Sequence, residues 1–396
     1  MERTYFNEIP SFHVFNAFSM ALDIAECKSI NHAKRIAYIS IRLARALNLT
    51  EDKIKNVYYA AALHDIGINN YNRSDILDKK TNWIVHCKKG EHILKRMNLP
   101  EEVYIAIKYH HERWDGKGPF ELYRNNIPII SQIVSLADEF DSIFDERIDY
   151  IKAKYIFTEA IIKNKNKRVS SEVIDGFLKI SEGERFWLDC KFNNFDYILN
   201  KILPKDMLNI NLESLENISE VFAGIIDSKS KFTHNHSRGI ANKMYCVTNI
   251  LGYNQVVQKK AYIAGLLHDL GKIAVPNSIL NKNGKLNTYE RGIIDTHPYY
   301  TRLILEQIPG IEDITSWASN HHERVDGKGY PQRLLGCELG DIDKLMCVCD
   351  VYQALTEDRP YRKGMEASKA WNIVNDMIID GALCPLATKK VRLALE

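Results

Sequence analysis

The chain has 396 residues, 45% of them hydrophobic and 26% charged, and is therefore long enough for two domains with separate cores. Its 53 basic and 51 acidic residues give a formal net charge of +2, a balance that excludes the basic surface of a protein that binds duplex nucleic acid or an anionic membrane. No uncharged apolar run could span a bilayer, the first residues lack a signal-peptide layout and the 8 cysteines show no CxxC spacing, so we expect a cytoplasmic protein with free thiols.

Helical periodicity governs the chain from its first predicted element onward. In residues 33–47, isoleucine and leucine recur at steps of three and four, as in an amphipathic helix. Residues 203–213 form a polar passage in which Pro204 breaks helical structure and separates two halves. Residues 262–267 are apolar all round and predict a buried helix that delivers the His-Asp pair following it. Polar loops rich in Gly or Pro are predicted at 281–285, 326–331 and 359–364.

The second half of the chain repeats the first. Residues 61–67 (AALHDIG) match residues 265–271 (GLLHDLG) at an offset of 204, and residues 110–118 (HHERWDGKG) match residues 321–329 (HHERVDGKG) at an offset of 211. No sustained stretch alternates apolar and polar residues at a period of two, so we predict an all-α fold made of a duplicated helical domain. The predicted domains are residues 1–205 and 206–396.

Histidine and aspartate gather at the repeated positions. Ten of the 13 histidines are paired by the repeat, and two aspartates join each set of five. A lone histidine is more simply explained as a core residue or a helix cap, but two such sets in register suit two metal ions that share a bridging carboxylate. Mixed N and O ligation without thiolate favours iron or manganese, and zinc or nickel would also suit. The two sets are His32, His64, Asp65, His86, His110, His111 and Asp138, and His236, His268, Asp269, His297, His321, His322 and Asp350.

Three motifs of the second half resemble the signature of the HD-GYP family. They are HDLGK (268–272), HHERVDGKGYP (321–331) and DVYQALTEDRPYR (350–362), and the resemblance is strong over residues 212–396. The family is a branch of the all-helical HD-domain metal-dependent phosphohydrolases, and it hydrolyses cyclic dinucleotides. The resemblance implies a phosphodiesterase that opens cyclic di-GMP to pGpG or GMP through a metal-bridging hydroxide. It also implies that the second set binds two divalent ions, with Asp269 as the bridging ligand and a catalytic residue.

The resemblance also implies a group of substrate-handling residues. Lys272 follows Asp269 by three positions and, if the helix continues, lies on the same face, where its ammonium would hold a phosphate oxygen during catalysis. Tyr330 of the GYP motif would contact the substrate. Arg359 and Arg362 carry planar guanidinium groups suited to phosphate or guanine, although a structural salt bridge would explain one of them equally well.

Departures from the family pattern distinguish the two halves. Some members hold a third metal with a glutamate four residues before the first ligand histidine, but this chain has Phe232 there, which favours two ions. In the first half, Ile68 stands where the second has Lys272, residues 118–120 read GPF instead of GYP, and no RPYR follows Asp138. We therefore expect a first half that can bind metal but catalyses poorly, as a regulatory or dimerising domain. An enzyme acting on a different substrate is the alternative for that half.

Other functions stay open at the level of sequence. Within the same enzyme class, 3′3′-cyclic GMP-AMP is the alternative substrate, because it differs from cyclic di-GMP in one base. A non-catalytic receptor for a cyclic dinucleotide is the alternative from a different class, and a di-iron oxygenase is a third hypothesis, against which the Lys and Arg phosphate groups count. We expect regulation to come from the first half, from a signalling partner protein, or from substrate and metal levels, and a homodimer is a further expected partnership.

Overall fold

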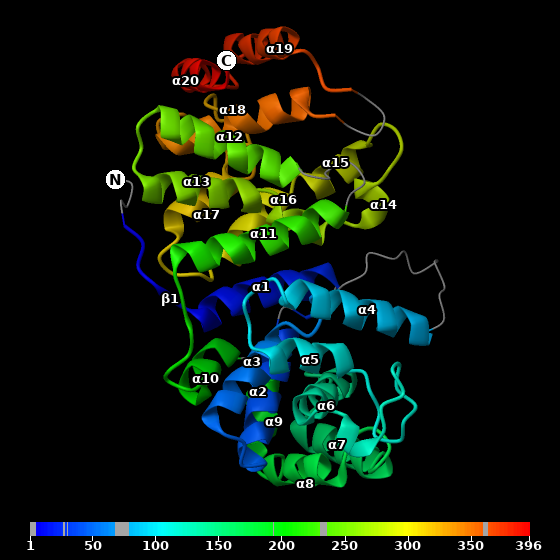
Figure 1. Cartoon of the computed structure of the whole chain (residues 1–396). Helices are drawn as coiled ribbons and strands as arrows, with labels where there is room; N and C mark the ends of the chain where they lie inside the picture. Colours follow the sequence, from blue (N-terminus) through cyan, green and yellow to red (C-terminus); the bar gives the residue numbers. More distant parts are fainter. Residues whose placement is uncertain are drawn as a thin grey trace. The chain divides into compact units, whose positions relative to one another are not determined.

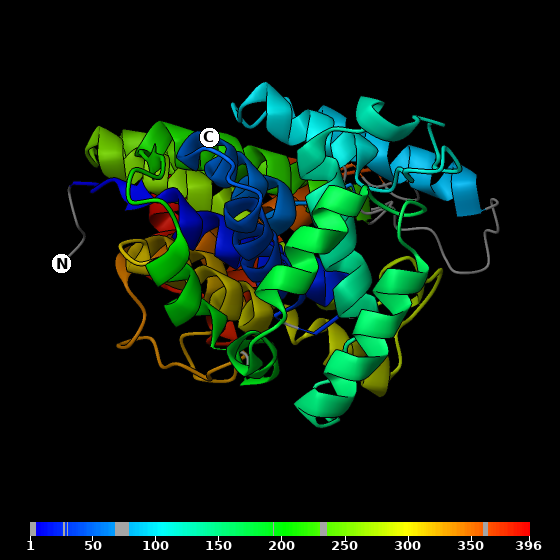
Figure 2. The same ribbon diagram turned by 90° about the horizontal axis from the view of Figure 1, so that it is seen from below.

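The regular secondary structure of the described residues is almost entirely helical, which confirms the predicted all-α class (Figures 1 and 2). The computed structural model describes residues 5–26, 28–29, 31–67, 79–192, 194–229, 236–358 and 363–396. It forms two compact units, one of residues 18–208 and one that joins residues 1–17 to residues 209–396. The sequence places the division three residues earlier and assigns residues 1–17 to the first half.

The first unit is built around the helix predicted from residues 33–47. This helix, α2, packs against α3, α6, α8 and α10. Its residues Ile36, Ile39 and Leu43 are fully buried, as the three- and four-residue steps require. The elements are α2 (His32–Ala46), α3 (Glu51–Ala62), α4 (Lys79–Leu94), α5 (Glu101–Tyr109), η1 (Arg124–Asn126), α6 (Ile129–Ile143), α7 (Tyr150–Lys163), α8 (Ser171–Ile180), α9 (Glu184–Phe192) and α10 (Phe195–Ile202).

The second unit repeats this plan and adds a short strand pair. Strand β1 (Ile9–Pro10) pairs antiparallel with β2 (Asn209–Ile210), which explains why the N-terminal residues belong to this unit. Helix α1 (Ser11–Ala25) begins there, and the buried helix α13 packs against α11, α12 and α17. The remaining elements are α11 (Leu212–Lys229), α12 (His236–Ile250), α13 (Gln255–Leu267), η2 (Leu270–Ala274), α14 (Asn277–Leu280), α15 (Thr288–Ile294), α16 (His297–Leu305), α17 (Glu312–Ser319), α18 (Asp341–Thr356), α19 (Ala367–Ile379) and α20 (Pro385–Leu395).

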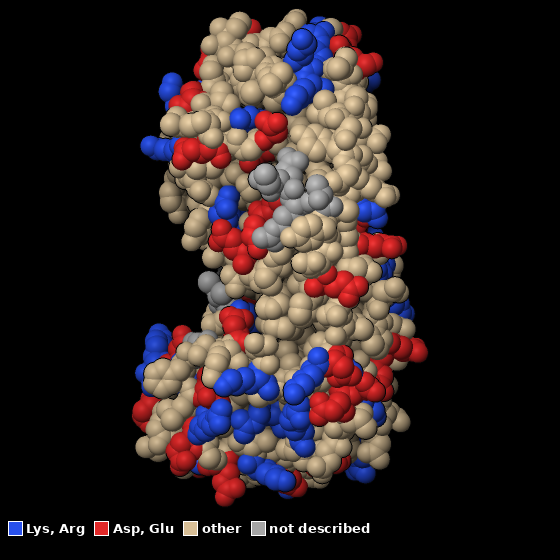
Figure 3. All heavy atoms as spheres, turned by 90° about the vertical axis from the view of Figure 1, so that its left-hand side faces the viewer, with Lys and Arg blue, Asp and Glu red and all other residues tan. Residues whose placement is uncertain are grey.

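The surface charge and the state of the cysteines agree with the expectations from composition. Acidic and basic side chains lie side by side over the face drawn in Figure 3, in keeping with the near-zero net charge. Within the described residues, no helix combines the length and apolar character needed to cross a membrane. Cys87, Cys190, Cys347 and Cys349 are buried free thiols as expected, whereas Cys337 is free but exposed.

Candidate metal centres

Equivalent helices deliver the candidate ligands in both halves. The first histidine of each set opens α2 or α12. The His-Asp pair lies just beyond the end of α3, after Leu63, or directly after α13. The third histidine lies on α4 or opens α16, the His-His pair follows α5 or α17, and the last aspartate lies on α6 or α18. The repeat seen in the sequence is therefore a repeat of ligand-bearing helices, most of whose ligands lie at or just beyond a helix end.

In the second half, Asp269 lies between two histidine clusters. Its Oδ2 atom is 3.3 Å from His268 Nε2 and 3.7 Å from His236 Nε2, while its Oδ1 atom is 3.3 Å from His297 Nε2 and 4.0 Å from His321 Nε2. Two groups of potential ligands thus share one carboxylate, which is the arrangement expected for two ions with a bridging aspartate. The groups are His236, His268 and Asp350 on one side and His297, His321 and His322 on the other.

Backbone carbonyls fix the tautomers of the buried imidazoles. The Nδ1 atoms of His268, His297 and His321 lie 2.7–2.8 Å from the carbonyl oxygen three residues earlier, so each Nδ1–H donates and each Nε2 keeps its lone pair for the centre. His268 Nε2 and Asp269 Oδ1 are buried and make no aligned hydrogen bond within the part of the chain that the structure describes. Such atoms destabilise a fold by about 1–3 kcal/mol each unless they are satisfied. The donor set therefore fits divalent metal ions.

Carboxylates outside the set orient the first histidines, and the sequence did not single them out. Glu357 Oε2 lies 2.8 Å from His236 Nδ1, and Asp141 Oδ2 lies 2.6 Å from His32 Nδ1. Each carboxylate follows the last aspartate of its set on or just after the same helix, which is the only sequence signal for it. Burial lowers the pKa of His236, but the hydrogen bonds that its ring donates to Asp350 and Glu357 outweigh burial and raise the pKa to about 9.

Lys272 contacts Asp269 as expected, but the backbone between them does not continue the α-helix that the sequence suggested. Helix α13 ends at Leu267, and residues 270–274 form a 3₁₀ helix instead of a continued α-helix. Because a 3₁₀ helix has three residues per turn, Asp269 and Lys272 still share a face. Lys272 Nζ lies 2.5 Å from Asp269 Oδ2. Burial opposes ionisation of Asp269, but His268 and Lys272 hold its pKa well below the usual range.

A cavity of about 490 Å³ opens beside this centre. It is lined by Lys272, Tyr330, His322 and Arg291 among others, so the predicted Lys and Tyr reach one hollow. The Tyr330 ring lies 4.9 Å from that of His322, and burial raises the pKa of its hydroxyl, which stays a donor at neutral pH. Arg291 belongs to no motif and was missed in the sequence. Arg359, Arg362, Phe232 and Ile68 lie outside the described residues.

The repeated DGKG phrase forms a loop held by the glutamate of HHE. Glu323 Oε1 and Oε2 accept hydrogen bonds from the backbone N–H groups of Gln332 and Leu334, at 2.7 and 3.0 Å. Glu112 makes the matching bonds in the first half, to Phe120 and Leu122. A carboxylate next to each His-His pair therefore ties the loop to the ligands, a role that explains why the phrase is kept in both halves.

Gly329 is the tightest point of this loop and gives a testable prediction. A Cβ atom there would lie 2.4 Å from Arg324 N and 2.5 Å from Glu323 Cα, so backbone would have to move. We expect Gly329→Ala to lower the Tm by about 3–10 °C, the range for an overpacked site, and to reduce bound metal. Gly224→Ala is the matched control, because its Cβ meets nothing within 4 Å in helix α11. Equal Tm values for the two variants would contradict this role of Gly329.

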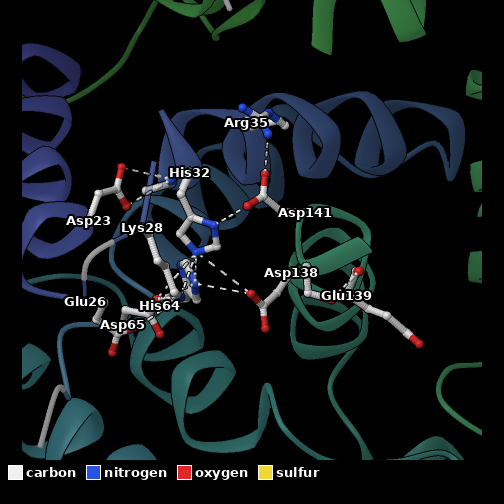
Figure 4. Close-up of polar contacts among 12 residues, drawn as sticks. Asp23, Glu26, Lys28, His32, Arg35, His64, Asp65, Asp138, Glu139 and Asp141 are labelled. Atoms are coloured by element: carbon white, nitrogen blue, oxygen red, sulfur yellow. Dashed lines mark hydrogen bonds and ion pairs between the residues drawn. The ribbon is translucent and has the colours of Figure 1, made fainter. Parts of the chain in front are cut away.

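The first half brings its seven candidate ligands together as well. Asp65 Oδ2 lies 3.0 Å from His64 Nε2 and 3.5 Å from His32 Nε2 (Figure 4). On its other side, Asp65 Oδ1 lies 3.8 Å from His86 Nε2. His64 and His110 donate Nδ1–H to the carbonyl three residues earlier, at 2.9 and 2.6 Å. The two potential ligand groups are His32, His64 and Asp138, and His86, His110 and His111.

Comparison with known proteins places both halves in one family. HD-domain models match residues 29–143 and 220–381. The 3′3′-cGAMP-specific phosphodiesterases 1 and 3 of Vibrio cholerae are 29% and 25% identical to this chain, over 93% of it in both cases and over 88% and 91% of their own lengths. A cyclic di-GMP phosphodiesterase of Pseudomonas aeruginosa, PA4108, is 38% identical over 37% of this chain and 35% of its own.

A solved structure shows the same fold over nearly the whole chain. The crystal structure of a cyclic GMP-AMP phosphodiesterase of V. cholerae, V-cGAP3, superposes with a TM-score of 0.73 over 98% of both chains at 21% sequence identity. The two HD matches together cover most of the residues, and the signature motifs lie in the second of them. The chain therefore belongs to the HD-domain family, as a tandem protein of the HD-GYP type.

Proposed function

We propose that the chain is a metal-dependent phosphodiesterase of cyclic dinucleotides, with its active centre in the second half. The observation that carries the proposal is the position of Asp269, between two imidazole clusters and in contact with Lys272 at the edge of a cavity. Names of the relatives support the same class. The first half is proposed as a regulatory or dimerising domain.

The chain's residues divide the work at this centre. His236, His268, Asp269 and Asp350 would hold one ion and His297, His321 and His322 the other, with Asp269 shared and iron or manganese the preferred metals. Divalent ions in such a centre supply Lewis acidity and an activated water at neutral pH.

Two side chains of the cavity wall would act on the substrate. The Lys272 ammonium would donate a hydrogen bond to a non-bridging phosphate oxygen. This bond would stabilise the negative charge that builds on the phosphate as the P–O bond breaks. The protonated Tyr330 hydroxyl is a second donor in the same cavity.

The choice of substrate now favours 3′3′-cyclic GMP-AMP. The sequence motifs placed cyclic di-GMP first, because the family they resemble notably hydrolyses that dinucleotide and no motif separates the two substrates. The relatives that align over 93% of the chain are both named for 3′3′-cGAMP, whereas PA4108 aligns over 37%. We therefore propose 3′3′-cGAMP as the preferred substrate and cyclic di-GMP as the second.

Turnover of the full chain tests this proposal. Protein loaded with Mn²⁺ or Fe²⁺ should open both cyclic dinucleotides to linear products, with kcat/KM at least about tenfold higher for 3′3′-cGAMP, a difference of about 1.4 kcal/mol. A reversed ratio would restore cyclic di-GMP as the substrate. Tight binding without turnover across Mn²⁺, Fe²⁺, Zn²⁺ and Ni²⁺ would instead identify a receptor, and oxygen consumption with a polyol would identify an oxygenase.

A further inference from the structure

A lysine lies inside the ligand cluster of the first half (Figure 4). Lys28 Nζ is 2.5 Å from Asp65 Oδ2, 2.9 Å from His32 Nε2 and 3.0 Å from Glu26 Oε2. An ammonium group has three N–H donors, and these three acceptors match them. Asp65 Oδ2 and His32 Nε2 are also the atoms that a metal ion bound between His32 and Asp65 would need.

The lone pair of His32 Nε2 is turned toward this lysine. His32 Nδ1 lies 2.6 Å from Asp141 Oδ2, so the ring donates from Nδ1 and accepts at Nε2. Asp141 is in turn held by Arg35, whose Nη1 atom lies 2.9 Å from Asp141 Oδ1. Fixed cations of the chain therefore already face the carboxylates on this side of the cluster.

The second half shows a different arrangement around the corresponding atoms. There Lys272 Nζ also lies 2.5 Å from the central aspartate, at Asp269 Oδ2. The first histidines themselves are placed alike: His236 Nε2 lies 3.7 Å from Asp269 and 3.6 Å from Asp350. His32 Nε2 lies 3.5 Å from Asp65 and 3.9 Å from Asp138. The difference lies in the lysine, because Lys28 Nζ is also 2.9 Å from His32 Nε2. Lys28 thus differs from Lys272 in bonding a ligand imidazole as well as the carboxylate, and so it lies where an ion would be coordinated.

We propose that the Lys28 ammonium replaces one metal ion of the first half. That half then binds at most a single ion, at His86, His110 and His111. The Nε2 atoms of His86 and His110 and the Nδ1 atom of His111 are buried without a hydrogen-bond partner among the described residues, and Asp65 Oδ1 faces them 3.8 Å from His86 Nε2. In such a half Asp65 would be kept as the partner of Lys28, because removing one member of a buried ion pair leaves the other charge uncompensated.

Metal content of the full chain tests this assignment without reference to substrate. After loading with Mn²⁺ and gel filtration, Lys28→Met should carry about one more Mn²⁺ per chain than the unmodified protein. Lys272→Met is the matched control, because it also removes an ammonium from the central aspartate but frees no imidazole, and it should gain none. An unchanged Mn²⁺ content in folded Lys28→Met, or a loss, would overturn the proposal.

A second measurement uses the unmodified chain and does not depend on a variant that folds. Crystals grown with Mn²⁺ and measured at the manganese absorption edge should show no anomalous peak beside His32 Nε2. A first-half peak, where there is one, should lie beside His86, His110 and His111. A peak within coordination distance of His32 Nε2 would overturn the assignment even if turnover by the second half is as proposed.

Discussion

Asp269→Ala is expected to abolish cyclic-dinucleotide hydrolysis, with kcat/KM falling by at least about a thousandfold. The reason is its central position: Asp269 faces His236 and His268 through one oxygen and His297 and His321 through the other, so its loss removes a donor from both ions. Metal analysis of the same protein should show loss of bound Mn²⁺. Steady-state rates on 3′3′-cGAMP and cyclic di-GMP measure the effect.

Asp65→Ala is the matched variant in the first half. Asp65 occupies the position equivalent to Asp269, but the first half has no GYP sequence. Asp65 also forms an ion pair with Lys28. Removing it leaves a partly buried ammonium short of one partner, so we expect a lower Tm, or altered dimerisation or rate, with turnover retained. If folded Asp65→Ala is inactive and Asp269→Ala is only mildly affected, the active centre lies in the first half.

Helix periodicity and the duplicated motifs were enough to predict the fold class and to name two sets of histidines and aspartates that the structure brings together. Both depend on local information, because a ligand at a helix end is positioned by its own helix, and the repeat supplied a second copy in register. The 3₁₀ helix at residues 270–274 could not be distinguished from a continued α-helix, since Lys272 faces Asp269 in either case.

Contacts between distant segments were not predictable in the same way. Lys28 reaches Asp65 across 37 residues and Glu357 reaches His236 across 121, and neither pair has a characteristic spacing. The pairing of Ile9 with Ile210, which draws the N-terminal residues into the second unit, is equally non-local. The role of Lys28, four residues before His32, can be recognised only from the positions of the ligand atoms around its ammonium group.

Lys272→Met is expected to lower kcat by about 10–150-fold with a smaller change in KM. A hydrogen bond to a charged group is worth about 1.5–3 kcal/mol, and it affects kcat when it strengthens as charge builds on the phosphate. Lys272→Arg should recover only part of the loss, because a guanidinium keeps the charge but not the point geometry of an ammonium. Bound Mn²⁺ should stay constant in both, which separates a substrate role from a role in holding metal.

The competing explanation is that Lys272 only neutralises Asp269. Its Nζ atom lies 2.5 Å from Asp269 Oδ2, and its side chain is 21% exposed, so a purely structural ion pair would also fit these contacts. A structural ion pair predicts a lower Tm and an unchanged kcat for Lys272→Met. Contact with the substrate predicts a lower kcat and an unchanged Tm. Lys369→Met, which removes an exposed lysine paired with Glu366 on the same half, controls for loss of charge and should change neither. A kcat for Lys272→Met equal to that of Lys369→Met would mean that Lys272 only neutralises the charge of Asp269 and does not act on the substrate.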